Sequence, residues 1–393
     1  MVTIEQLVDL QSPDGERLLA ELGDLSATLA TSIAVATQLR KMYPAALVSA
    51  AMTMHGLRIR GRVKFNRADG MWFTRDGLEQ ATSESIATWR AGRYREFFEI
   101  VDLCCGIGGD LLAIAAGVPQ ASLTAVDRDP LHLAMARSNA AAQGLHDRVD
   151  FVEADVRGVA VGDQAAVFID PARRSERGRM TAGESDPPLE WCLALASGAR
   201  AVGIKCAPGL DRDRIPAQWE FEAIAVGTDL KETVLWSPHL AKSDRAATVI
   251  GGATIHQLHP VEGESVMVRM PEAGSILLDP NPAVTRSGLV EDLARTVGAM
   301  KIDDWIGFLV SESPVSSPFA RSFRIVDSAP WNERLLKARL RKLGAGSVVI
   351  RRRGLAGDVD SITRRLRGQG DRPLTIAMTR VMNEPWALIC EGC

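Results

Sequence analysis

Acidic side chains and glycines that could hold a small nucleoside gather near residue 106 of this 393-residue chain. The run Glu99-Ile-Val-Asp-Leu-Cys-Cys-Gly-Ile-Gly-Gly-Asp110 begins within a mostly apolar stretch, Phe98 to Leu103, that predicts a buried strand, and then contains Gly106, Gly108 and Gly109. Because glycine lacks a Cβ atom, the backbone N–H groups of such a turn can approach a ligand closely. The spacing predicts a pocket for a nucleotide-like ligand at this turn.

Two aspartates indicate which nucleoside would fit. A dinucleotide fingerprint reads G-x-G-x-x-G, and Leu111 stands here in place of the third glycine. Asp127 lies 21 residues after Gly106, near the spacing at which an acid accepts hydrogen bonds from ribose hydroxyls. A loop with an incomplete pyrophosphate grip, flanked by Asp102 and Asp127, suits a cationic nucleoside without phosphates. S-adenosylmethionine (SAM) fits that description.

Four separated segments resemble, in order and spacing, the SAM-binding half of class I RNA methyltransferases. They are Asp102-x-x-Cys105-Gly-Ile-Gly-Gly109, Ala125-Val-Asp-Arg-Asp-Pro130, Ala136-Arg-Ser-Asn-Ala140 and Gly144-Leu145. The residues of these motifs are most similar to those of trimethylguanosine synthase and its bacterial relatives. The later Asp170-Pro-Ala-Arg-Arg174 and the C-terminal third resemble bacterial methyltransferases with a THUMP-like domain, so the similarity covers most of the chain from about Lys64 onward.

The resemblance implies a cofactor site built at strand ends. It implies that Asp102 lies toward the methionine ammonium, through a water or the loop, and that Asp127 holds the ribose. Asp155 follows the next strand, where this fold uses an acid to accept from the adenine amino group; an N-cap or turn aspartate is the alternative. We expect cofactor binding by Asp102, Cys104, Gly106, Gly108, Asp127, Arg128 and Asp155.

The segment Asp170-Pro-Ala-Arg-Arg174 should meet the methyl acceptor. Relatives that methylate exocyclic amines have Asp/Asn-Pro-Pro-aromatic here: the first two residues orient the amine and the aromatic ring stacks on the base. Ala172 and Arg173 replace the second proline and the ring, so only the orienting half is kept. A stacking group would have to come from Trp72, Trp191 or an arginine plane. We expect catalysis by Asp170, Pro171 and Lys205.

Lys205 has two interpretations. It could pair with Asp170 and, with Glu232, form the kind of set that deprotonates a hydroxyl in ribose 2′-O-methyltransferases, or it could make a structural ion pair. Cys206 lacks the Pro-Cys or Thr-Cys context of a 5-methylcytosine enzyme and is disfavoured as a nucleophile. Before the first central strand, Thr82-Ser-Glu-Ser85 predicts a capped helix beside the pocket, with Thr82 or Ser83 as the cap; Gln80 and Ser83 could instead face the methionine end of SAM.

No metal site is predicted. Cys104 and Cys105 are adjacent, which suits neither a disulfide nor zinc, and Cys390-Glu-Gly-Cys393 has no second ligand pair. The terminal cysteines indicate an incidental pair at a frayed end.

The charge distribution indicates a nucleic-acid partner. The formal net charge is −3, but the segment from Glu333 to Arg380 holds 13 Lys and Arg against 4 Asp and Glu, which is +9 locally and leaves −12 for the rest. This asymmetry is typical of a nucleic-acid-binding region on an otherwise acidic protein. Residues 58–65 are also basic. They could contact substrate phosphates, or they could form a solvated turn between helices. The candidate RNA contacts are Arg173, Arg174, Arg351, Arg352 and Arg353.

Alternating apolar strands and helices must position these residues. Alternation from residue 99 to 206 predicts a parallel α/β sheet, a Rossmann-like class I methyltransferase fold whose ligands lie at the carboxyl ends of the strands. We expect three domains: helices over 1–90, the methyltransferase over 91–255, closed by antiparallel strands, and a THUMP-like α+β domain over 256–393. No long apolar run and no signal peptide is evident, so we expect a cytoplasmic protein without a membrane span.

These features favour a SAM-dependent methyltransferase acting on structured RNA, tRNA or rRNA, at a base nitrogen. Two alternatives stay open. The chain could be an RNA-binding protein that holds SAM without turnover. The absence of an aromatic residue after Asp170-Pro171 favours this alternative. It could also methylate a small molecule, which a neutral C-terminal third would have favoured.

Overall fold

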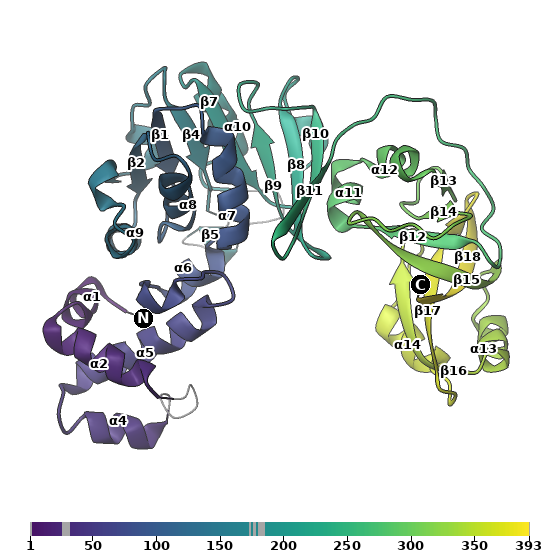
Figure 1. The fold of residues 1–393 in the computed structure, drawn as a ribbon, viewed down its shortest axis with the longest axis horizontal. Coiled ribbons are helices and arrows are strands. Elements are labelled where there is room, and N and C mark those ends of the chain that lie inside the picture. The colour runs from purple at the N-terminus through teal and green to yellow at the C-terminus, as the bar shows by residue number, and fades with distance from the viewer. Residues whose placement is uncertain (1, 26–31, 173, 176–177, 180–184, 393) are drawn as a thin grey trace. The chain divides into compact units, whose positions relative to one another are not determined.

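The computed structural model describes residues 2–25, 32–172, 174–175, 178–179 and 185–392. Within these residues the chain divides into two compact units (Figure 1). The first holds residues 1–219 and 234–241, and the second holds residues 220–233 and 242–393. The division of the chain into domains at residues 90 and 255 stays a prediction, since these two units follow other limits.

The N-terminal part of the first unit is helical, as the sequence predicts. Each of α1, α2 and α4 begins at a Ser or Thr whose hydroxyl accepts a backbone N–H of the first turn. The apolar faces share one core with Ile107 and Leu112 of the methyltransferase part. The helices are α1 Ile4–Leu10, α2 Pro13–Gly23, α4 Ile33–Leu39, α5 Ala45–Gly61, α6 Arg75–Gln80 and α7 Glu84–Ala91.

The parallel α/β arrangement of the first unit is confirmed. Its strands lie in the order β9-β7-β4-β1-β2-β3, and the pairs among β7, β4, β1, β2 and β3 are all parallel. The elements are β1 Glu99–Leu103, α8 Gly109–Gly117, β2 Ser122–Asp127, α9 Pro130–Ala142, β3 Val149–Glu153, β4 Ala166–Ile169, α10 Leu189–Ala194, β7 Ala201–Cys206 and β9 Asp229–Trp236, whose last three residues belong to this unit.

The strand order reverses at β1, which has β2 on one side and β4 on the other. Such a switch point opens a crevice at the carboxyl ends of the strands, where parallel α/β sheets bind ligands. Residues 100–103 of β1 and all of β4 are buried, as expected for strands covered on both faces. The loops after β1 and β4 are therefore the places where this fold holds a ligand.

The second unit begins with β8 Glu220–Val226, β10 Arg245–Gly251 and β11 Thr254–Leu258. The expectation of antiparallel closing strands is wrong for one pair: β8 and β10 are parallel, whereas β10 and β11 are antiparallel. The 18 residues from Gly227 to Asp244 let the chain return in the same direction, which a short hairpin could not do.

A seven-stranded sheet forms the rest of the second unit, in the order β13-β14-β12-β15-β18-β17-β16. Only the β16–β17 pair is parallel. The strands are β12 Ile276–Pro280, β13 Met300–Lys301, β14 Leu309–Ser311, β15 Ala320–Pro330, β16 Ala345–Arg352, β17 Arg372–Val381 and β18 Glu384–Gly392, and the helices are α11 Pro282–Ser287, α12 Val290–Val297, α13 Glu333–Lys342 and α14 Val359–Leu366.

The C-terminus is not frayed, which corrects the sequence-based interpretation. The last strand, β18, pairs with both β15 and β17, and Cys390 on it is fully buried. Cys393 lies outside the described residues. The apolar run Ala387–Cys390 is buried within this strand, which holds the end of the chain in the sheet.

No helix among the described residues has both the length and the apolar character that crossing a membrane requires.

Candidate active site

Asp102 is a buried carboxyl group at the end of β1. The residue is 1% exposed, and neither carboxylate oxygen has a hydrogen-bond partner among the described residues. Burial raises the pKa of Asp102 well above its usual range, and the negative charges of Asp110 and Asp170 raise it further. A buried carboxylate without a partner is costly. A cation bound beside Asp102 would relieve this cost.

The loop after β1 has the backbone conformation of a ligand cradle. Cys104, Gly106 and Gly108 all have positive φ angles, of 61°, 54° and 88°. A Cβ atom on Gly106 would meet nothing within 4 Å, whereas one on Gly108 would meet Ala136 of α9 at 3.3 Å. Gly106 therefore borders open space, and Gly108 permits the loop to pack on α9. Burial raises the pKa of the Cys104 thiol, so Cys104 stays protonated at neutral pH.

Asp127 fixes the loop from the end of β2. Its Oδ2 accepts the Gly106 N–H at 2.8 Å, and its Oδ1 accepts the Asp129 N–H at 2.9 Å. Each carboxylate oxygen has a second lone-pair site, so Asp127 keeps capacity for two hydroxyl donors. Asp129 in turn caps α9 by accepting the N–H groups of Leu131 and His132. The acid at the predicted ribose position thus also holds the glycine loop in place.

Arg128 and Asp155 belong to an ion-pair cluster that links three loops. Asp155 caps a short 3₁₀ turn by accepting the Arg157 N–H at 2.9 Å, and this hydrogen bond lowers its pKa. Arg157 also pairs with Asp155 and Asp186, and Arg128 pairs with Asp186 at 2.9 Å. The capping role given as the alternative for Asp155 is thus present; its contact with adenine stays a prediction, as does that of Arg128 with the cofactor.

Asp170 and Lys205 lie together at the ends of β4 and β7. Lys205 Nζ donates to Asp170 Oδ2 at 2.5 Å and to the Thr82 hydroxyl at 3.0 Å. Lys205 is 8% exposed, whereas the Asp170 side chain is 26% exposed. The described residues offer no hydrogen-bond partner to Asp170 Oδ1. The pair therefore presents one oriented carboxylate oxygen to the space beyond the strand ends.

Sequence reasoning missed the polar residues that support this pair. The predicted side-chain cap of α7 is wrong: Ser83 stands at the N-cap position, but its side chain makes no capping hydrogen bond within the described residues. The Thr82 hydroxyl instead accepts from Lys205 and from Arg90, the latter at 2.9 Å. Arg90 is 2% exposed, pairs with Asp110 and lies 4.6 Å above the Phe168 ring. An arginine within a helix gives no signal of burial, because most arginines are exposed.

Asn139 was quoted as part of a motif, but its role was not predicted. It is fully buried: its Oδ1 accepts the Trp72 N–H at 2.7 Å, and its Nδ2 donates to the carbonyls of Trp72 and Ile107, the latter at 2.9 Å. Asn139 therefore joins the N-terminal segment to the glycine loop. Trp72 is buried beneath the guanidinium of Arg58, 4.9 Å from its ring centroid. This position does not suit Trp72 to stack on a substrate base.

The basic segment 58–65, which covers the last turn of α5 and the residues just after it, mostly makes contacts inside the unit. Arg58 donates to the Met71 carbonyl, Arg62 pairs with Asp69, and Lys64 donates to the carbonyls of residues 78, 79 and 81. Arg58 and Arg62 connect the end of α5 to residues 69–71, and Lys64 binds the C-terminal end of α6. Three of the four cations in residues 58–64 are thus explained by folding, and Arg60 is the exception among the described residues.

Two of the three arginines in the triplet 351–353 form ion pairs with a carboxylate inside the domain. Arg351 and Arg353 both pair with Asp279, at 3.0 and 2.9 Å, and lie over the rings of Phe323 and Phe308. Arg352 points elsewhere, because side chains alternate along a strand, and donates to the Gly357 carbonyl. Arg173 lies outside the described residues, and for Arg174 only the backbone is described, in a short strand (β5, Arg174–Ser175).

The fold and the cofactor loop define a class I SAM-dependent methyltransferase. The model of a methyltransferase domain matches residues 100–169, a THUMP domain-like model matches residues 320–392, and a domain of unknown function, DUF8688, matches residues 3–61. The chain is 36% identical over 315 residues to a SAM-dependent methyltransferase of Mycobacterium tuberculosis, named as uncharacterized, in strains CDC 1551 / Oshkosh and ATCC 25618 / H37Rv. The match covers 79% of this chain and 84% of that protein, so the chain belongs to this family of SAM-dependent methyltransferases.

A solved structure supports the fold over nearly the whole chain. It comes from Porphyromonas gingivalis W83, is named as a methyltransferase and gives a TM-score of 0.69 at 19% identity, covering 90% of this chain and 92% of that one. The protein is thus an enzyme that uses SAM and carries a C-terminal THUMP-like domain. The narrower likeness to trimethylguanosine synthase stays a prediction.

Proposed function

We propose that this enzyme methylates structured RNA, tRNA or rRNA, at a base nitrogen. The observation that carries the proposal is a surface of unpaired cations on α13 and α14 of the THUMP-like domain. It consists of Arg334, Lys337, Arg341, Lys342, Arg364 and Arg367, all exposed and without a polar partner among the described residues. We call these six residues the helical cationic face.

Helix geometry explains why these cations gather. Arg334, Lys337 and Arg341 are spaced three and four residues apart, which places them on one side of α13. The opposite side of α13 buries Leu336 and Leu340 in a core that α14 shares. Arg365 of α14 pairs with Glu333 of α13 at 2.6 Å, which joins the two helices. Phosphates are the natural partner for cations displayed in this way.

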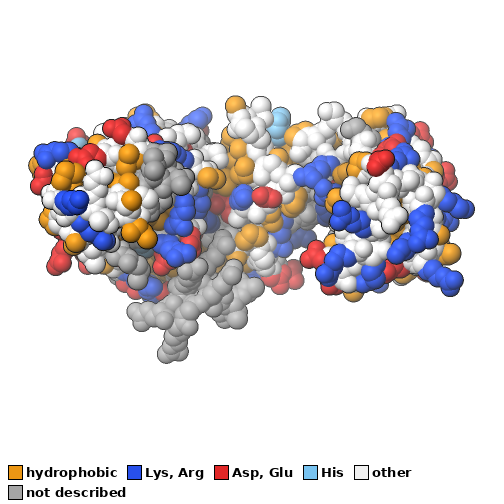
Figure 2. All heavy atoms as spheres, turned by 90° about the horizontal axis from the view of Figure 1, so that it is seen from below, with side chains coloured by type: hydrophobic (Ala, Val, Ile, Leu, Met, Phe, Trp, Pro, Cys, Tyr) orange, Lys and Arg blue, Asp and Glu red, His pale blue; other side chains and the backbone are white. Residues whose placement is uncertain are grey.

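The helical cationic face replaces Arg351 and Arg353 in the proposal. Those two arginines would have to leave Asp279 to reach a phosphate, and Asp279 would then be buried without a counterion. The members of the helical cationic face lose no such partner. Figure 2 shows Lys and Arg side chains across the visible surface of the C-terminal unit.

The residues around β1 fit SAM. Asp102 offers a buried, unpartnered carboxylate to the methionine ammonium, and Gly106 leaves the open space that the ligand needs. Asp127 would accept from the ribose hydroxyls, Cys104, Gly108 and Arg128 would line the loop, and Asp155 would accept from the adenine amino group. Bound SAM supplies an activated methyl group on its sulfonium.

Asp170 would orient the acceptor. Its free Oδ1 would accept an N–H of the target base while Lys205 holds Oδ2, and the Pro171 carbonyl would accept a second N–H. Lys205 therefore acts as a positioning residue. Fixing the attacking atom in line with the methyl group accounts for much of the rate that such a site can provide.

The experiment combines a product assay with a variant of Asp170. Wild-type protein is incubated with labelled SAM and total RNA, and the nucleosides are then analysed for a labelled methylated base. Asp170→Ala should abolish transfer while calorimetry shows unchanged SAM affinity, because Asp170 faces the acceptor. Asp163→Ala removes an exposed carboxylate from the loop before β4 and serves as the matched control.

Each alternative gives a different result. A methylated ribose would favour the hydroxyl-deprotonating role of the Asp170–Lys205 pair. Label in a small molecule, with no salt-dependent RNA affinity, would favour a small-molecule enzyme. RNA and SAM binding without any product would favour a binding protein. Full transfer by Asp170→Ala would refute the role given to Asp170.

A further inference from the structure

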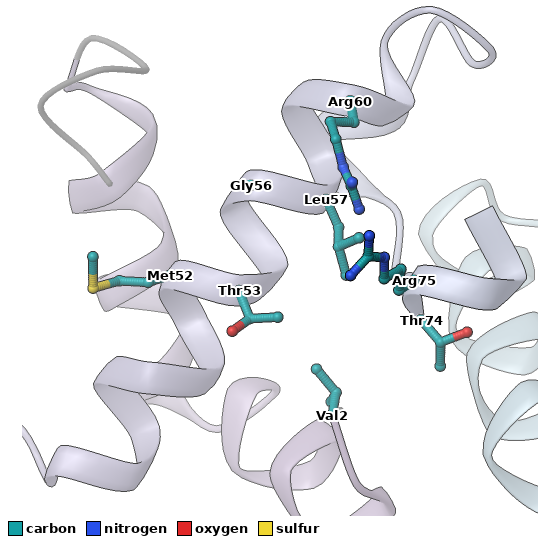
Figure 3. A pocket seen from close by; sticks show the side chains of 8 residues that line it. All are labelled: Val2, Met52, Thr53, Gly56, Leu57, Arg60, Thr74 and Arg75. Carbon is teal, nitrogen blue, oxygen red and sulfur yellow. The ribbon is translucent and has the colours of Figure 1, made fainter. Parts of the chain in front are cut away.

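The first unit has an open pocket of about 420 Å³ that the methyltransferase chemistry does not use. Successive turns of α5 form the long wall of this pocket. Val2 and the first residues of α6 line its other sides (Figure 3). Figure 3 shows Arg60 and Arg75 reaching toward each other near Leu57.

The two arginines leave positive charge at this pocket. Arg60 is exposed and has no polar partner in the described part of the chain, unlike Arg58 and Arg62 on either side of it. Arg75 contacts Glu79 at 3.4 Å, and its side chain is 72% exposed. An exposed pair of this length contributes little, so Arg75 can exchange Glu79 for a ligand anion.

Gly56 supplies an independent observation. It lies inside a 17-residue helix, where glycine is less favourable than alanine because of its backbone entropy. A Cβ atom on Gly56 would meet nothing within 4 Å, so no protein neighbour explains the glycine. Its missing side chain instead leaves a flat stretch of helix in the pocket wall, between the apolar Met52 and Leu57 and the two arginines. A planar group could lie against this stretch.

The helix α6 contacts both the pocket and the glycine loop after β1. Thr74 caps α6 by accepting the Gly77 N–H at 2.8 Å and also contacts His132 of α9 at 3.0 Å. A Cβ atom on Gly77 would lie only 2.6 Å from Ile107 of the glycine loop, so α6 packs tightly on that loop. Thr74 and Arg75 line the pocket at the beginning of the same helix.

We propose that this pocket binds one unpaired nucleotide of the substrate RNA, with its phosphate on Arg60 and Arg75 and its base against Gly56 and Leu57. The inference rests on the proposed function, that the substrate is RNA. Cations that hold the phosphate are one element of single-strand recognition, and in this pocket an apolar wall takes the place of the aromatic side chains on which bases usually stack. An RNA strand is the favoured source because a pocket this open gives a free mononucleotide few contacts, whereas a strand carries further phosphates that can bind elsewhere on the protein.

Binding of a fluorescein-labelled single-stranded RNA tests the inference, with its duplex as comparison. Arg60→Gln with Arg75→Gln should weaken binding of the single strand about tenfold and lower the salt slope by about 2. Gly56→Leu should fill the pocket and weaken it roughly fivefold. Duplex binding should change less. Matched controls are Arg62→Gln, which removes a cation paired with Asp69, and Gly23→Leu, another helical glycine with free space. All variants should keep wild-type SAM affinity.

The outcomes separate this inference from the proposed function. If wild-type enzyme methylates RNA and the pocket variants bind single strands as tightly as the controls do, the inference is wrong and the proposed function stands. If wild-type enzyme neither binds nor methylates RNA, both fail. AMP binding that Gly56→Leu abolishes, without any effect on RNA binding, would assign the pocket to free nucleotides and overturn the choice of RNA.

Discussion

Asp170 and Asp279 both pair with cations, yet they differ in what they leave free. Asp170 contacts one lysine through one oxygen, and its side chain is 26% exposed. Asp279 is 10% exposed in its side chain and uses both oxygens on Arg351 and Arg353. The first arrangement leaves one carboxylate oxygen without a partner in the described part of the chain, whereas in the second both oxygens are engaged by arginines and little of the carboxyl group is exposed to a substrate. Spare hydrogen-bonding capacity, rather than charge, distinguishes a candidate site from a structural ion pair.

The arginines of the C-terminal domain show the same difference. Arg351 and Arg353 have a carboxylate partner and an aromatic ring each. The helical cationic face has neither among the described residues, although it lies in the same domain. A count of charges along the sequence cannot separate the two groups. The comparison predicts that removing a charge has opposite consequences in them: loss of stability in the first and loss of RNA binding in the second.

The largest effect should come from Lys205→Gln. Without the ammonium, the Asp170 carboxylate loses its orientation, and misplacement of this kind reduces kcat by roughly 100-fold. The KM for SAM should stay the same, because Lys205 contacts Asp170 and Thr82. Steady-state kinetics across pH gives the second readout. A purely structural lysine would change thermal stability and leave the pH profile of kcat unaltered, and that result would contradict the positioning role.

Asp279→Ala should be the most destabilising of these substitutions. It leaves Arg351 and Arg353 partly buried without their anion; since their side chains are 29% and 24% exposed, solvent screening limits the cost to about 2 kcal/mol. Urea unfolding measures the change. The control is Glu333→Ala, which breaks the more exposed pair with Arg365 and should cost under about 1 kcal/mol. Equal costs for the two variants would remove the distinction between these ion pairs.

The position of the cofactor loop could be predicted from the sequence, because short sequence patterns determine where its strands end and where its glycines lie. Asp102 and Asp170 end parallel strands, and strands of one parallel sheet end at a common edge, so two residues 68 positions apart could be expected near one another. The glycines at 106 and 108 need positive φ angles, which their type alone suggests.

The support for that site depends on contacts that no local pattern encodes. Lys205 reaches Thr82 across 123 positions of the chain, and Asn139 reaches Trp72 across 67. Asp279 lies 72 positions before Arg351. All three arginines of the triplet 351–353, at the end of β16 and just after it, were predicted to contact RNA, although the alternation of a strand sends the middle residue away from the other two. These errors share one cause, since a tertiary partner decides whether a charge is exposed.

Asp102→Asn should weaken SAM binding about tenfold while stabilising the protein without SAM at neutral pH. The folded-state pKa of Asp102 is raised, so ionisation of this buried group opposes folding as pH rises through that pKa, and an amide removes the cost. SAM brings an ammonium that favours the ionised form. Binding by the wild-type protein should therefore release protons, which calorimetry in buffers of different ionisation enthalpy detects. Proton uptake, or no exchange, would contradict the pairing.

Single substitutions on the helical cationic face should have the smallest effects. Arg334→Gln or Lys337→Gln should each reduce RNA affinity about twofold to threefold and lower the salt slope by about 1, because each exposed cation contributes one screened phosphate contact. Thermal stability should not change, since neither side chain has a polar partner among the described residues. Arg352→Gln, on the strand, is the matched control: it removes an exposed cation that donates to the Gly357 carbonyl. If Arg352→Gln changed the salt slope as much as Lys337→Gln, the strand would also contact RNA. The distinction between the helical cationic face and the arginines of residues 351–353 would then be wrong.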